Sequence, residues 1–585
     1  MENWVIKNKK ADFNHIVSLC GISEVLARCL VNKGIDNPEM INTFLNPDIK
    51  HLYSPLLLKD MQKACDILVD KIKSGKKIRI IGDYDVDGVV ATYILYKTLK
   101  EIGAQVDYEI PDRIKDGYGM NVNQVEAAYH EQVDTILTCD NGIAALEQIE
   151  LAKQYQMTVI VTDHHNLVQT EEGEYILPAA DAVINPKRPD CTYPFEDLCG
   201  AAIAYKLSVA ILDYFDFSEK EIFLEELLSY AAIATVCDVM DLVGENRIIV
   251  KRGLELLQRT QNKGLLALMD ISGIDKTQLS AFHLGFVIGP CLNASGRLDT
   301  AKKGLDLLLS ETKEDAVELA VEVQNLNNLR KNMTADNTEK AIKLIEETDL
   351  KYDKVLVVYI EGCHESIAGI IAGRIREKYN KPTLILTEAE NCLKGSARSI
   401  EHYNMVDELS KCRDLFIKMG GHPMAAGFSL LPENLEALRY KLNHTTELTE
   451  EMLIPKVTID IHLPLGYITE PLVHELRQLE PFGKGNEKPL FAEKDLRIRS
   501  AFIIGKNASG IRLRLENKYG REMEAVYFGD VSQFFQYMGN TYGIEEADKL
   551  KTGRGINTKI AITYFPRINE YKGFKTIQLM IQNYR

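Results

Sequence analysis

The stretch Lys77-Ile-Arg-Ile-Ile-Gly-Asp-Tyr-Asp-Val-Asp-Gly88 points most directly to the fold, because an apolar, strand-like run leads straight into three alternating aspartates. Two further apolar runs end in the same way: Thr135-Ile-Leu-Thr138 precedes Asp140, and Thr158-Val-Ile-Val161 precedes Asp163-His164-His165. In an open parallel sheet, ligands bind outside the carboxyl ends of the strands. We therefore expect these acidic and imidazole side chains to meet at one edge of a parallel α/β sheet.

The order of patterns along the chain predicts several domains. From residue 77 to about residue 240, strand-like and helix-like runs alternate, as in successive βαβ units. A long amphipathic stretch without proline or glycine predicts a connecting helix, and a second α/β block follows it. In that block, residues 394–399 and 420–427 are expected to form small-residue loops. The expected domains are an N-terminal helical segment (1–75), a parallel-sheet catalytic domain (76–312), a connecting helix (313–348), a smaller α/β domain (349–454) and a small antiparallel β-barrel (455–585).

The composition excludes several classes of protein. Apolar residues make up 45% and charged residues 26% of 585 residues, as is ordinary for a soluble globular protein. The first ten residues lack the apolar centre of a signal peptide, and no apolar run reaches the roughly 18 residues of a membrane span. Eleven scattered cysteines without a C-x-x-C pair favour reduced thiols over disulfides or structural zinc. We therefore expect a cytoplasmic protein.

The distribution of charge bears on a nucleic-acid partner. The whole chain carries −16, which by itself argues against phosphate binding. Residues 491–585, however, contain 16 Lys and Arg against 10 Asp and Glu, a net +6, so that the rest of the chain carries −22. A basic C-terminal module is compatible with local binding of phosphates. A moderately basic domain without nucleic acid is the alternative on charge alone.

The alternating aspartates also resemble the start of an EF-hand calcium loop. Such a loop needs a bidentate glutamate at its twelfth position, and counting from Asp83 that position is Ile94. A strand-like segment precedes the motif where an EF-hand has a helix. Asp85 and Asp87 are spaced so that each can face a different ion, and Gly88 is expected to turn the backbone into a helix beginning near Val89. An Asp-rich turn without any ligand is the alternative for this motif alone.

The Asp163-His164-His165 motif gives the clearer indication of a transition metal. Neutral imidazole is a common metal ligand, and an adjacent carboxylate can orient the ring through its other N–H. Mixed carboxylate and imidazole ligation suits Mn²⁺ or Mg²⁺, with Mn²⁺ favoured by the imidazole. Two such ions would clamp an attacking hydroxide and a scissile phosphate, so the sequence predicts hydrolysis of phosphate esters.

Asp140 and Asp238 are weaker candidates when each is taken alone. Asp140 precedes Asn-Gly, so it could simply belong to a turn. Asp238 ends the apolar run Ala234-Thr-Val-Cys-Asp238, where a carboxylate could cap a helix or pair within the core. Four acidic motifs within one βαβ block make coincidence a poor explanation.

In combination, these motifs resemble the DHH phosphoesterase superfamily, and most closely its RecJ family. The resemblance covers nearly the whole chain, in order. The matching segments are Gly82-Asp-Tyr-Asp-Val-Asp-Gly88, Pro111-Asp-Arg113, Gly117-Tyr-Gly119, Cys139-Asp-Asn-Gly142, Thr162-Asp-His-His165, Thr235-Val-Cys-Asp238, Ile288-Gly-Pro290, Asn293-Ala-Ser-Gly-Arg297, Lys394-Gly-Ser-Ala-Arg-Ser399, Gly420-Gly-His-Pro-Met-Ala-Ala-Gly427, Leu479-Glu-Pro-Phe-Gly483 and Gly485-Asn486.

The resemblance implies an enzyme, a single-stranded-DNA-specific 5′→3′ exodeoxyribonuclease of DNA repair and recombination. It implies a DHH catalytic domain, a DHHA1 domain and an OB-fold domain, with two Mn²⁺ or Mg²⁺ ions per site. The implied metal ligands are Asp83, Asp85, Asp87, Asp140, His164 and Asp238, and the implied catalytic residues are Asp140, His164 and His165. The implied substrate-binding residues are His165, Arg113, Asn293, Arg297, Ser396, Arg398, Gly420, Gly421 and His422. By resemblance, the partners are single-stranded DNA, single-strand-binding protein and a RecQ-type helicase, and the chain is expected to be a monomer that does not bind membranes.

The chain departs from the family's pattern at one position, and two alternative functions stay open. Members of the family usually carry Trp-His where this chain has Cys363-His364, which puts a stacking role there in doubt. A relative that cleaves nano-RNA or cyclic dinucleotides would not need the basic barrel. A replication scaffold with a dead site would not need intact ligand motifs.

Overall fold

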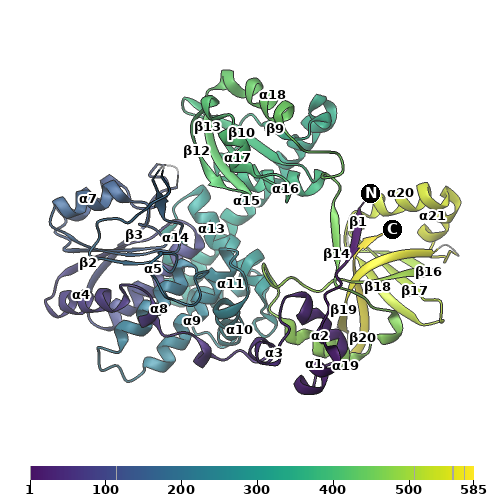
Figure 1. Ribbon diagram of the computed structural model, residues 1–585, viewed down its shortest axis with the longest axis horizontal. Coiled ribbons are helices and arrows are strands. Elements are labelled where there is room, and N and C mark those ends of the chain that lie inside the picture. The colour runs from purple at the N-terminus through teal and green to yellow at the C-terminus, as the bar shows by residue number, and fades with distance from the viewer. Residues whose placement is uncertain (1, 114, 171, 506–507, 557–558, 572) are drawn as a thin grey trace. The chain divides into compact units, whose positions relative to one another are not determined.

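The computed structural model describes residues 2–113, 115–170, 172–505, 508–556, 559–571 and 573–585 (Figure 1). These residues form two compact units. The first unit comprises residues 49–455 and contains both α/β domains. The second comprises residues 2–48 together with 456–585.

A five-stranded parallel sheet forms the centre of the first α/β domain. Its order is β3-β2-β4-β5-β8, and every neighbouring pair is parallel. The strands are β2 (Lys77–Ile81), β3 (Gln105–Glu109), β4 (Thr135–Cys139), β5 (Thr158–Thr162) and β8 (Ala182–Ile184). The strand order reverses between β2 and β4, which makes this the topological switch point where open α/β sheets bind ligands. The parallel sheet expected from the sequence is thus confirmed.

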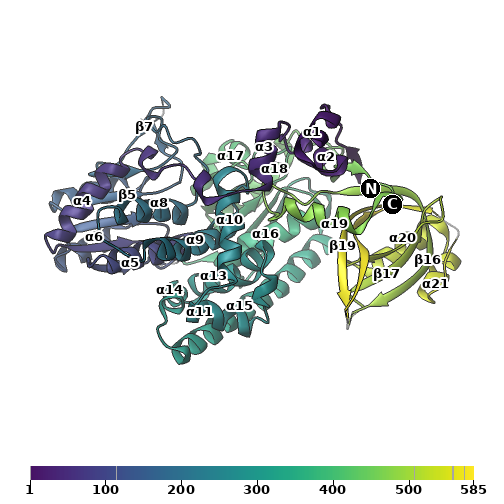
Figure 2. The same ribbon diagram turned by 90° about the horizontal axis from the view of Figure 1, so that it is seen from below.

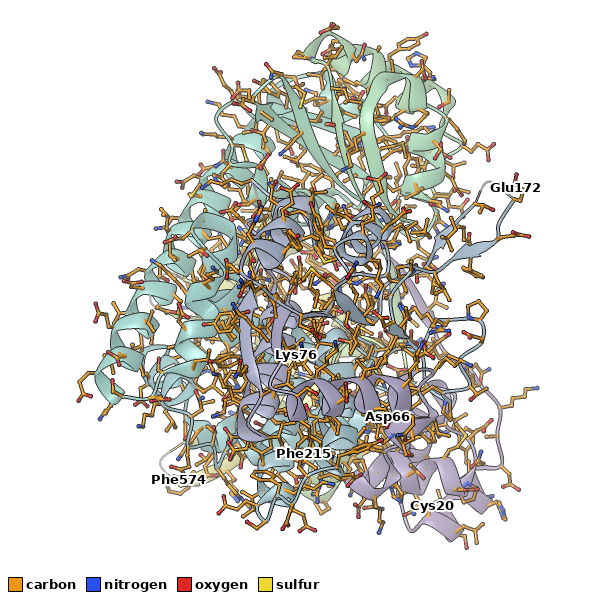
Figure 3. All side chains as sticks on the ribbon, turned by 90° about the vertical axis from the view of Figure 1, so that its left-hand side faces the viewer. Cys20, Asp66, Lys76, Glu172, Phe215 and Phe574 are labelled. Atoms are coloured by element: carbon orange, nitrogen blue, oxygen red, sulfur yellow. The ribbon has the colours of Figure 1, made fainter. Side chains whose placement is uncertain are left out.

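Helices cover both faces of this sheet, which explains why its strands are continuously apolar. On one face α6 (Val122–His130) and α7 (Leu146–Gln154) pack over Ile136 and Val159. On the other face a larger core gathers α4 (Met61–Lys73), α5 (Val86–Glu101), α8 (Gly200–Leu212), α9 (Lys220–Cys237), α10 (Gly244–Leu257) and α11 (Lys263–Ile271). Figure 3 labels Asp66 on α4 and Lys76 in the connection that leads from α4 into β2.

A 35-residue helix, α15 (Lys313–Glu347), joins this domain to the next one, as the sequence predicts. It begins with Thr312, whose side chain accepts a hydrogen bond from Asp315 N, and glutamate and aspartate occupy its first turn. Its first half packs into the core of the parallel-sheet domain through Ala316, Ala320 and Val323. Its second half packs against α16 (Glu365–Tyr379) through Ala341 and Ile345.

The second α/β domain contains a mixed five-stranded sheet of order β12-β13-β11-β10-β9. Its strands are β9 (Leu356–Tyr359), β10 (Thr383–Ala389), β11 (Cys392–Arg398), β12 (Phe416–His422) and β13 (Ala425–Leu430), with α17 (Met405–Ser410) and α18 (Leu435–Thr445) beside them. The expectation of loops at 394–399 and 420–427 is wrong, because these small residues mostly lie in paired strands. Glycine is needed at 395, where a Cβ would lie 2.2 Å from the Phe428 ring.

The second unit is built on a closed barrel. Its strands are β16 (Phe491–Ile504), β17 (Gly510–Glu516), β18 (Glu522–Tyr527), β20 (Phe574–Tyr584) and β19 (Lys559–Tyr571), and β19 pairs back with β16 (Figure 2). The sequence predicts an antiparallel barrel, and the structure differs in one pair, because β18 and β20 are parallel. Two helices, α20 (Val531–Tyr542) and α21 (Ile544–Lys551), connect β18 to β19.

The N-terminal residues pack with this barrel. β1 (Asn3–Ile6) pairs in parallel with β14 (Lys456–Ile459). The apolar faces of α1 (Phe13–Cys20), α2 (Glu24–Asn32) and α3 (Pro38–Leu45) share one core with the barrel strands and with α19 (Glu470–Leu476), because helices this short cannot bury those faces by themselves. Within the described ranges no single helix meets the length and hydropathy of a membrane span, and only α1 and α2 taken together, bent by 112°, do so.

Candidate metal centre and adjoining cleft

The first acidic loop connects β2 to α5. Asp85 caps the helix, since its Oδ1 accepts hydrogen bonds from the backbone amides of Asp87 and Gly88 at 2.9 and 3.1 Å. The helix therefore begins at Val86, three residues before the predicted start. Glycine is required at position 88 because the backbone at Asp83 packs closely against it: a Cβ there would lie 2.5 Å from the Asp83 carbonyl oxygen.

The Asp87 carboxylate lies at the N-terminus of α8. Its two oxygens accept hydrogen bonds from the amides of Gly200 and Ala201 at 2.6 and 2.8 Å. These amides and the helix dipole stabilise a carboxylate at this position. Gly200 also brings α8 close to the next strand end, since a Cβ there would lie 2.6 Å from Cβ of Asp140. No local pattern in the sequence indicated this role for α8.

Asp140 follows β4 in a strained, left-handed backbone conformation with φ of 59°. The Tyr118 hydroxyl donates a hydrogen bond to its carbonyl oxygen at 2.8 Å. The next residue, Asn141, donates from Nδ2 to the carbonyl oxygens of Ile81 and Cys139, which ties together the ends of β2 and β4. The Asp-Asn-Gly turn thus holds the Asp140 side chain rigidly between the two strands.

Asp163 organises the loop after β5. Its Oδ1 accepts hydrogen bonds from the backbone amides of His164 and His165 and lies 2.8 Å from Nδ1 of His165, while its Oδ2 accepts one from Ile143 N at 2.9 Å. Burial raises the pKa of Asp163, but the hydrogen bond and charge of His165 outweigh it and hold the pKa below its usual value. Asp163 therefore orients the two histidines rather than facing the acidic cluster.

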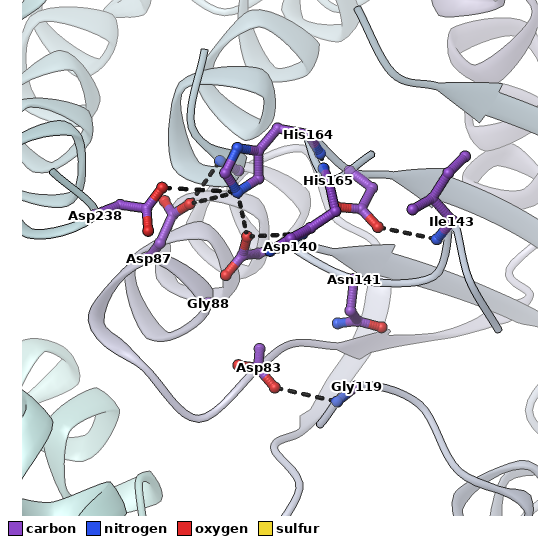
Figure 4. A network of polar contacts seen from close by, with 12 residues as sticks. Asp83, Asp87, Gly88, Gly119, Asp140, Asn141, Ile143, His164, His165 and Asp238 are labelled. Atoms are coloured by element: carbon purple, nitrogen blue, oxygen red, sulfur yellow. Dashed lines mark hydrogen bonds and ion pairs between the residues drawn. The ribbon is translucent and has the colours of Figure 1, made fainter. Parts of the chain in front are cut away.

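Side chains from four separate segments of the chain converge at the switch point (Figure 4). Nε2 of His164 lies 3.1 Å from Asp140 Oδ1, 3.6 Å from Asp87 Oδ2 and 3.7 Å from Asp238 Oδ2. Asp238 caps the C-terminal end of α9. Ligand-type atoms of three overlapping groups lie within 4.8 Å of one another: Asp83, Asp85 and Asp140; Asp87, His164 and Asp238; and Asp140, His164 and His165.

The electrostatics of the cluster are unfavourable without a cation. Burial, followed by the charge of a neighbouring aspartate, raises the pKa of Asp83 and of Asp238 to about 8. The same two causes raise the pKa of Asp85 and Asp140. Burial lowers the pKa of His164, so this ring is neutral and can offer a lone pair. Like charges crowded in a buried site call for a compensating positive charge.

The donor set fits a hard divalent cation. Asp83 Oδ2 is buried and makes no hydrogen bond to any residue that the structure describes, which leaves its lone pairs free for a ligand. Several carboxylate oxygens with one or two imidazole nitrogens are a set suited to Mn²⁺ or Mg²⁺. No thiolate belongs to these three groups, so the set does not favour a zinc or iron–sulfur centre.

A basic cleft adjoins this cluster within the same unit. It has a volume of about 560 Å³, and its cationic lining residues are Arg113, Arg297, Lys394, Arg398 and Lys418. Arg297 donates to the Ser366 carbonyl oxygen at the start of α16. Burial and then the charges of Arg113 and Arg330 lower the pKa of Arg297 to about 9. Packed cations of this kind indicate a binding site for anions.

The cleft is joined to the acidic loop by direct packing. Arg297 lies on α13 (Gly289–Leu298), in which a Cβ at Gly296 would lie 2.5 Å from the Tyr84 carbonyl oxygen. The guanidinium of Arg113 lies 4.1 Å from the centroid of the Tyr84 ring. The loop that carries the first aspartates therefore also forms one border of the cleft.

The structure brings together some of the substrate-binding residues that the sequence suggested. Ser396, Arg398 and Gly420 line the cleft beside Arg113 and Arg297. Asn293, Gly421 and His422 do not belong to that lining, although Gly421 and His422 directly follow Gly420 on β12. The sequence did not predict Lys418 or the part of α16 that lines the cleft. The lining residues of α16 are Glu365, Ser366, Ala368, Gly369 and Ile370. Side chains alternate between the two faces of a strand, so a residue two positions before Gly420 on β12 lies on the same face as Gly420. This spacing could have indicated Lys418.

Cys363 is buried in the core beside α16, with 4% of its surface exposed. It cannot take over the stacking role of an aromatic residue. The next residue, His364, caps the N-terminus of α16, and its Nδ1 accepts a hydrogen bond from Ser366 N at 3.3 Å.

Known family models match the chain domain by domain. The DHH family model for its N-terminal domain matches residues 77–235, the DHHA1 domain model matches 352–447, and the RecJ OB domain model matches 459–583. Single-stranded-DNA-specific exonuclease RecJ of Bacillus subtilis is 35% identical over 566 residues, covering 96% of this chain and 68% of that protein. The Escherichia coli protein of the same name is 30% identical, covering 96% and 95%.

Solved structures show the same fold. RecJ from Thermus thermophilus in complex with Mn²⁺ matches with a TM-score of 0.81 at 24% identity, covering 100% of this chain and 79% of that one. An exonuclease RecJ bound to manganese is 30% identical, with a TM-score of 0.59, and covers 69% of this chain and 98% of that one.

The parallel sheet, its acidic cluster and the second α/β domain define a protein of the DHH family. Within it, the chain belongs to the RecJ family, because relatives at least 30% identical are matched over more than two thirds of their length.

Proposed function

We propose that the chain is a metal-dependent hydrolase that degrades single-stranded DNA from its 5′ end to mononucleotides. One observation carries this proposal: a buried carboxylate cluster and a cleft lined by arginines share the loop at Tyr84. A phosphodiester held by the cleft would therefore reach the cluster. Preference for single strands follows from the RecJ relatives, which are named as single-stranded-DNA-specific exonucleases. The 5′→3′ polarity rests on membership of the family, since the site chemistry would serve either end.

The proposed ligands of two Mn²⁺ or Mg²⁺ ions are Asp83, Asp85, Asp87, Asp140, His164 and Asp238. When bound, such ions activate water and neutralise the charge that develops on the phosphate. Asp140 takes part in both halves of the cluster, while the raised pKa values of Asp83 and Asp238 mean that these carboxyls must lose protons before they can bind a cation. His164 offers Nε2 toward Asp140 and Asp238.

His165 is proposed to contact the scissile phosphate. Burial lowers its pKa, but the hydrogen bond and charge of Asp163 outweigh this and raise the pKa to about 9. The ring is therefore a cation at neutral pH, and it lies beside the Tyr118 hydroxyl at 3.0–3.1 Å. Asp163 and Tyr118 thus fix a positive charge at the edge of the cluster, and this charge would attract a phosphate.

The remaining phosphates are proposed to lie in the cleft, with Arg113, Arg297, Ser396, Arg398 and Gly420 as direct contacts. Asn293, Gly421 and His422 are proposed to contact substrate next to them. Arginine suits this role because its planar guanidinium can bind two phosphate oxygens at once.

The domain roles follow the predicted boundaries. We propose that 76–312 carries the chemistry, that 313–348 connects it to the substrate-binding domain 349–454, and that 455–585 binds the strand without cleaving it, with the helices of 1–75 in supporting roles. We also propose that the protein acts as a monomer in the cytoplasm, in repair and recombination. Single-strand-binding protein and a RecQ-type helicase are its proposed partners, and no membrane is involved.

The test is digestion of a long single strand in the presence of Mn²⁺, labelled in parallel reactions at either end. We expect the 5′ label to appear at once as mononucleotide while the 3′ label stays in long products, and a blunt duplex to resist. Immediate loss of the 3′ label, or equal attack on the duplex, would contradict the proposal. Cleavage limited to nano-RNA or cyclic dinucleotides would favour a small-substrate enzyme, and strand binding without hydrolysis would favour a scaffold.

A further inference from the structure

The edge strand β8 ends on the same side of the sheet as the strands that lead into the metal centre, because all five strands are parallel. β2, β4 and β5 each lead into acidic or imidazole side chains at this side. The residue that follows β8 is Asn185, and it is fully buried. A buried amide costs free energy unless it is hydrogen-bonded, so its partners indicate its role.

Both halves of the Asn185 amide are hydrogen-bonded. Its Nδ2 donates to the carbonyl oxygen of His165 at 2.9 Å, across 20 positions of sequence. Its Oδ1 accepts a hydrogen bond from Lys187 N at 2.8 Å. The side chain therefore joins the segment after β8 to the loop after β5.

The loop after β5 is attached to the end of β8 at two points. Asp163 N donates a hydrogen bond to the Ile184 carbonyl oxygen at 3.0 Å, and Asn185 makes the second attachment at His165. Asp163 Oδ1 lies 3.0 Å from the amide nitrogen and 2.8 Å from Nδ1 of His165. Asp163 thus holds the amide and the ring of His165, while Asn185 holds its carbonyl group.

The segment that carries Asn185 is itself firmly anchored. Arg188 is 7% exposed, and its Nη1 donates a hydrogen bond to Asp60 Oδ2 at 2.7 Å. Its Nε and Nη2 donate to the two oxygens of Asp190 at 2.9 and 2.8 Å. Because this segment is fixed on both sides of the arginine, the bond from Asn185 can constrain His165 instead of following its movements.

We propose that Asn185 is a positioning residue of the catalytic site, which holds His165 in place through the carbonyl oxygen of that residue. The inference rests on the proposed function, since it takes His165 as a contact of the scissile phosphate. A group at a reacting centre must be held within about 0.5 Å of its productive position by such supporting bonds. An amide does this without adding a further negative charge beside the acidic cluster, which a carboxylate at position 185 would do.

Two substitutions of Asn185 test the role. Asn185→Asp keeps the acceptor for Lys187 N and removes the donor to His165, while Asn185→Ala removes both bonds and adds no charge. Each is expected to lower kcat for cleavage of a single-stranded oligonucleotide about 10–100-fold at saturating Mn²⁺. KM, and binding of the strand in a chelator, should stay within about twofold of the wild type, because the bond does not contact substrate.

Asn262→Asp is the matched control within the same domain. Oδ1 of Asn262 accepts a hydrogen bond from Leu265 N at 2.8 Å, and its Nδ2 donates to the distant Leu308 carbonyl oxygen at 2.7 Å. The substitution therefore removes the same kind of donor at the start of α11. It is expected to leave kcat unchanged, and a loss of kcat equal to that of Asn185→Asp would overturn the positioning role.

A double-mutant cycle identifies the group on which Asn185 acts. Adding Asn185→Ala to His165→Ala should lower kcat no further, because the positioned group is already gone. Losses that multiply would overturn the proposal, as would wild-type kcat in both Asn185 variants.

Asn185→Asp buries a charge, so Asn185→Ala carries the test if the aspartate variant does not fold. Unfolding of both variants would make Asn185 a structural residue and overturn the proposal. If the wild-type protein cleaves no strand, the proposed function itself fails. If it cleaves and the Asn185 variants match it, only the positioning role fails.

Discussion

Oδ1 of Asp140 lies 3.1 Å from Nε2 of His164, and the same side chain also groups with Asp83 and Asp85 within 4.8 Å. Asp140 therefore belongs to both halves of the acidic cluster. Its left-handed backbone, held by the bond from Tyr118 and by the neighbouring Asn141, fixes this shared position. A strand end at the switch point of the sheet thus becomes the centre of the candidate site.

Replacing Asp140 should abolish hydrolysis and leave the fold intact. We expect Asp140→Ala to lower the rate of Mn²⁺-dependent cleavage at least about 10²–10³-fold, because a preorganised charge at the reacting centre is lost. Binding of single strands and the unfolding temperature should stay near those of the wild type. Asp270→Asn, which alters an exposed aspartate on α11, is the control. Near-normal turnover of Asp140→Ala would refute a role for the cluster in catalysis.

The metal-free protein should lose stability as the pH rises from about 7 to about 8.5. The pKa values of Asp83 and Asp238 are about 8 in the folded protein and near 3.8 in an unfolded chain. In this range the folded state binds more protons than the unfolded state, so the free energy of unfolding falls with pH. The pKa of His165, raised to about 9, acts in the same direction. Thermal unfolding in a chelator at several pH values measures the effect.

Added Mn²⁺ should oppose that loss and raise the unfolding temperature most at the higher pH, because binding requires ionised carboxylates. Asp83→Asn should reduce the pH dependence of the metal-free protein. Stability that increases with pH in the chelator would contradict the assigned pKa shifts.

Glu245 should be essential for stability rather than for catalysis. Its carboxylate lies 2.7 Å from Lys206 Nζ, and it accepts hydrogen bonds from Tyr53 N and the Tyr193 hydroxyl. Both charged groups are almost completely buried, so Glu245→Ala would leave Lys206 unpaired and cost about 3–5 kcal/mol of unfolding free energy. Denaturant unfolding measures this loss. Glu255→Ala on the same helix breaks only an exposed pair with Arg252 and should have little effect.

The first compact unit should act alone on short substrates. A chain of residues 49–455 is expected to cleave short oligonucleotides with Mn²⁺ but to bind long strands more weakly, with a smaller salt dependence, because the basic barrel is absent. Residues 2–48 must be removed together with 456–585, since the N-terminal helices share the core of the barrel. Unchanged affinity for long strands would mean that the barrel does not bind DNA.

The acidic positions could be found from the sequence because their signals are local. Asp83, Asp140 and Asp163 each follow an apolar run, and the end of such a run marks the end of a strand. A parallel sheet then brings the ends of its strands together. The long helix α15 could be predicted for a similar reason, since neither proline nor glycine interrupts its period. The loops predicted at 394–399 and 420–427 failed, because glycine signals turns in isolation but permits close strand packing in a sheet.

Local patterns of residues were enough to predict the fold class, and they pointed to acidic and imidazole side chains that the structure brings together. What each of those side chains does became visible only in three dimensions. The folded chain separates Asp163, which is saturated by hydrogen bonds, from the clustered aspartates, and it places Gly200 of α8 against Asp87. It also joins residues 2–48 to a barrel more than 400 positions away in sequence. These outcomes depend on contacts between segments distant along the chain, and no local pattern of residues encodes such a contact.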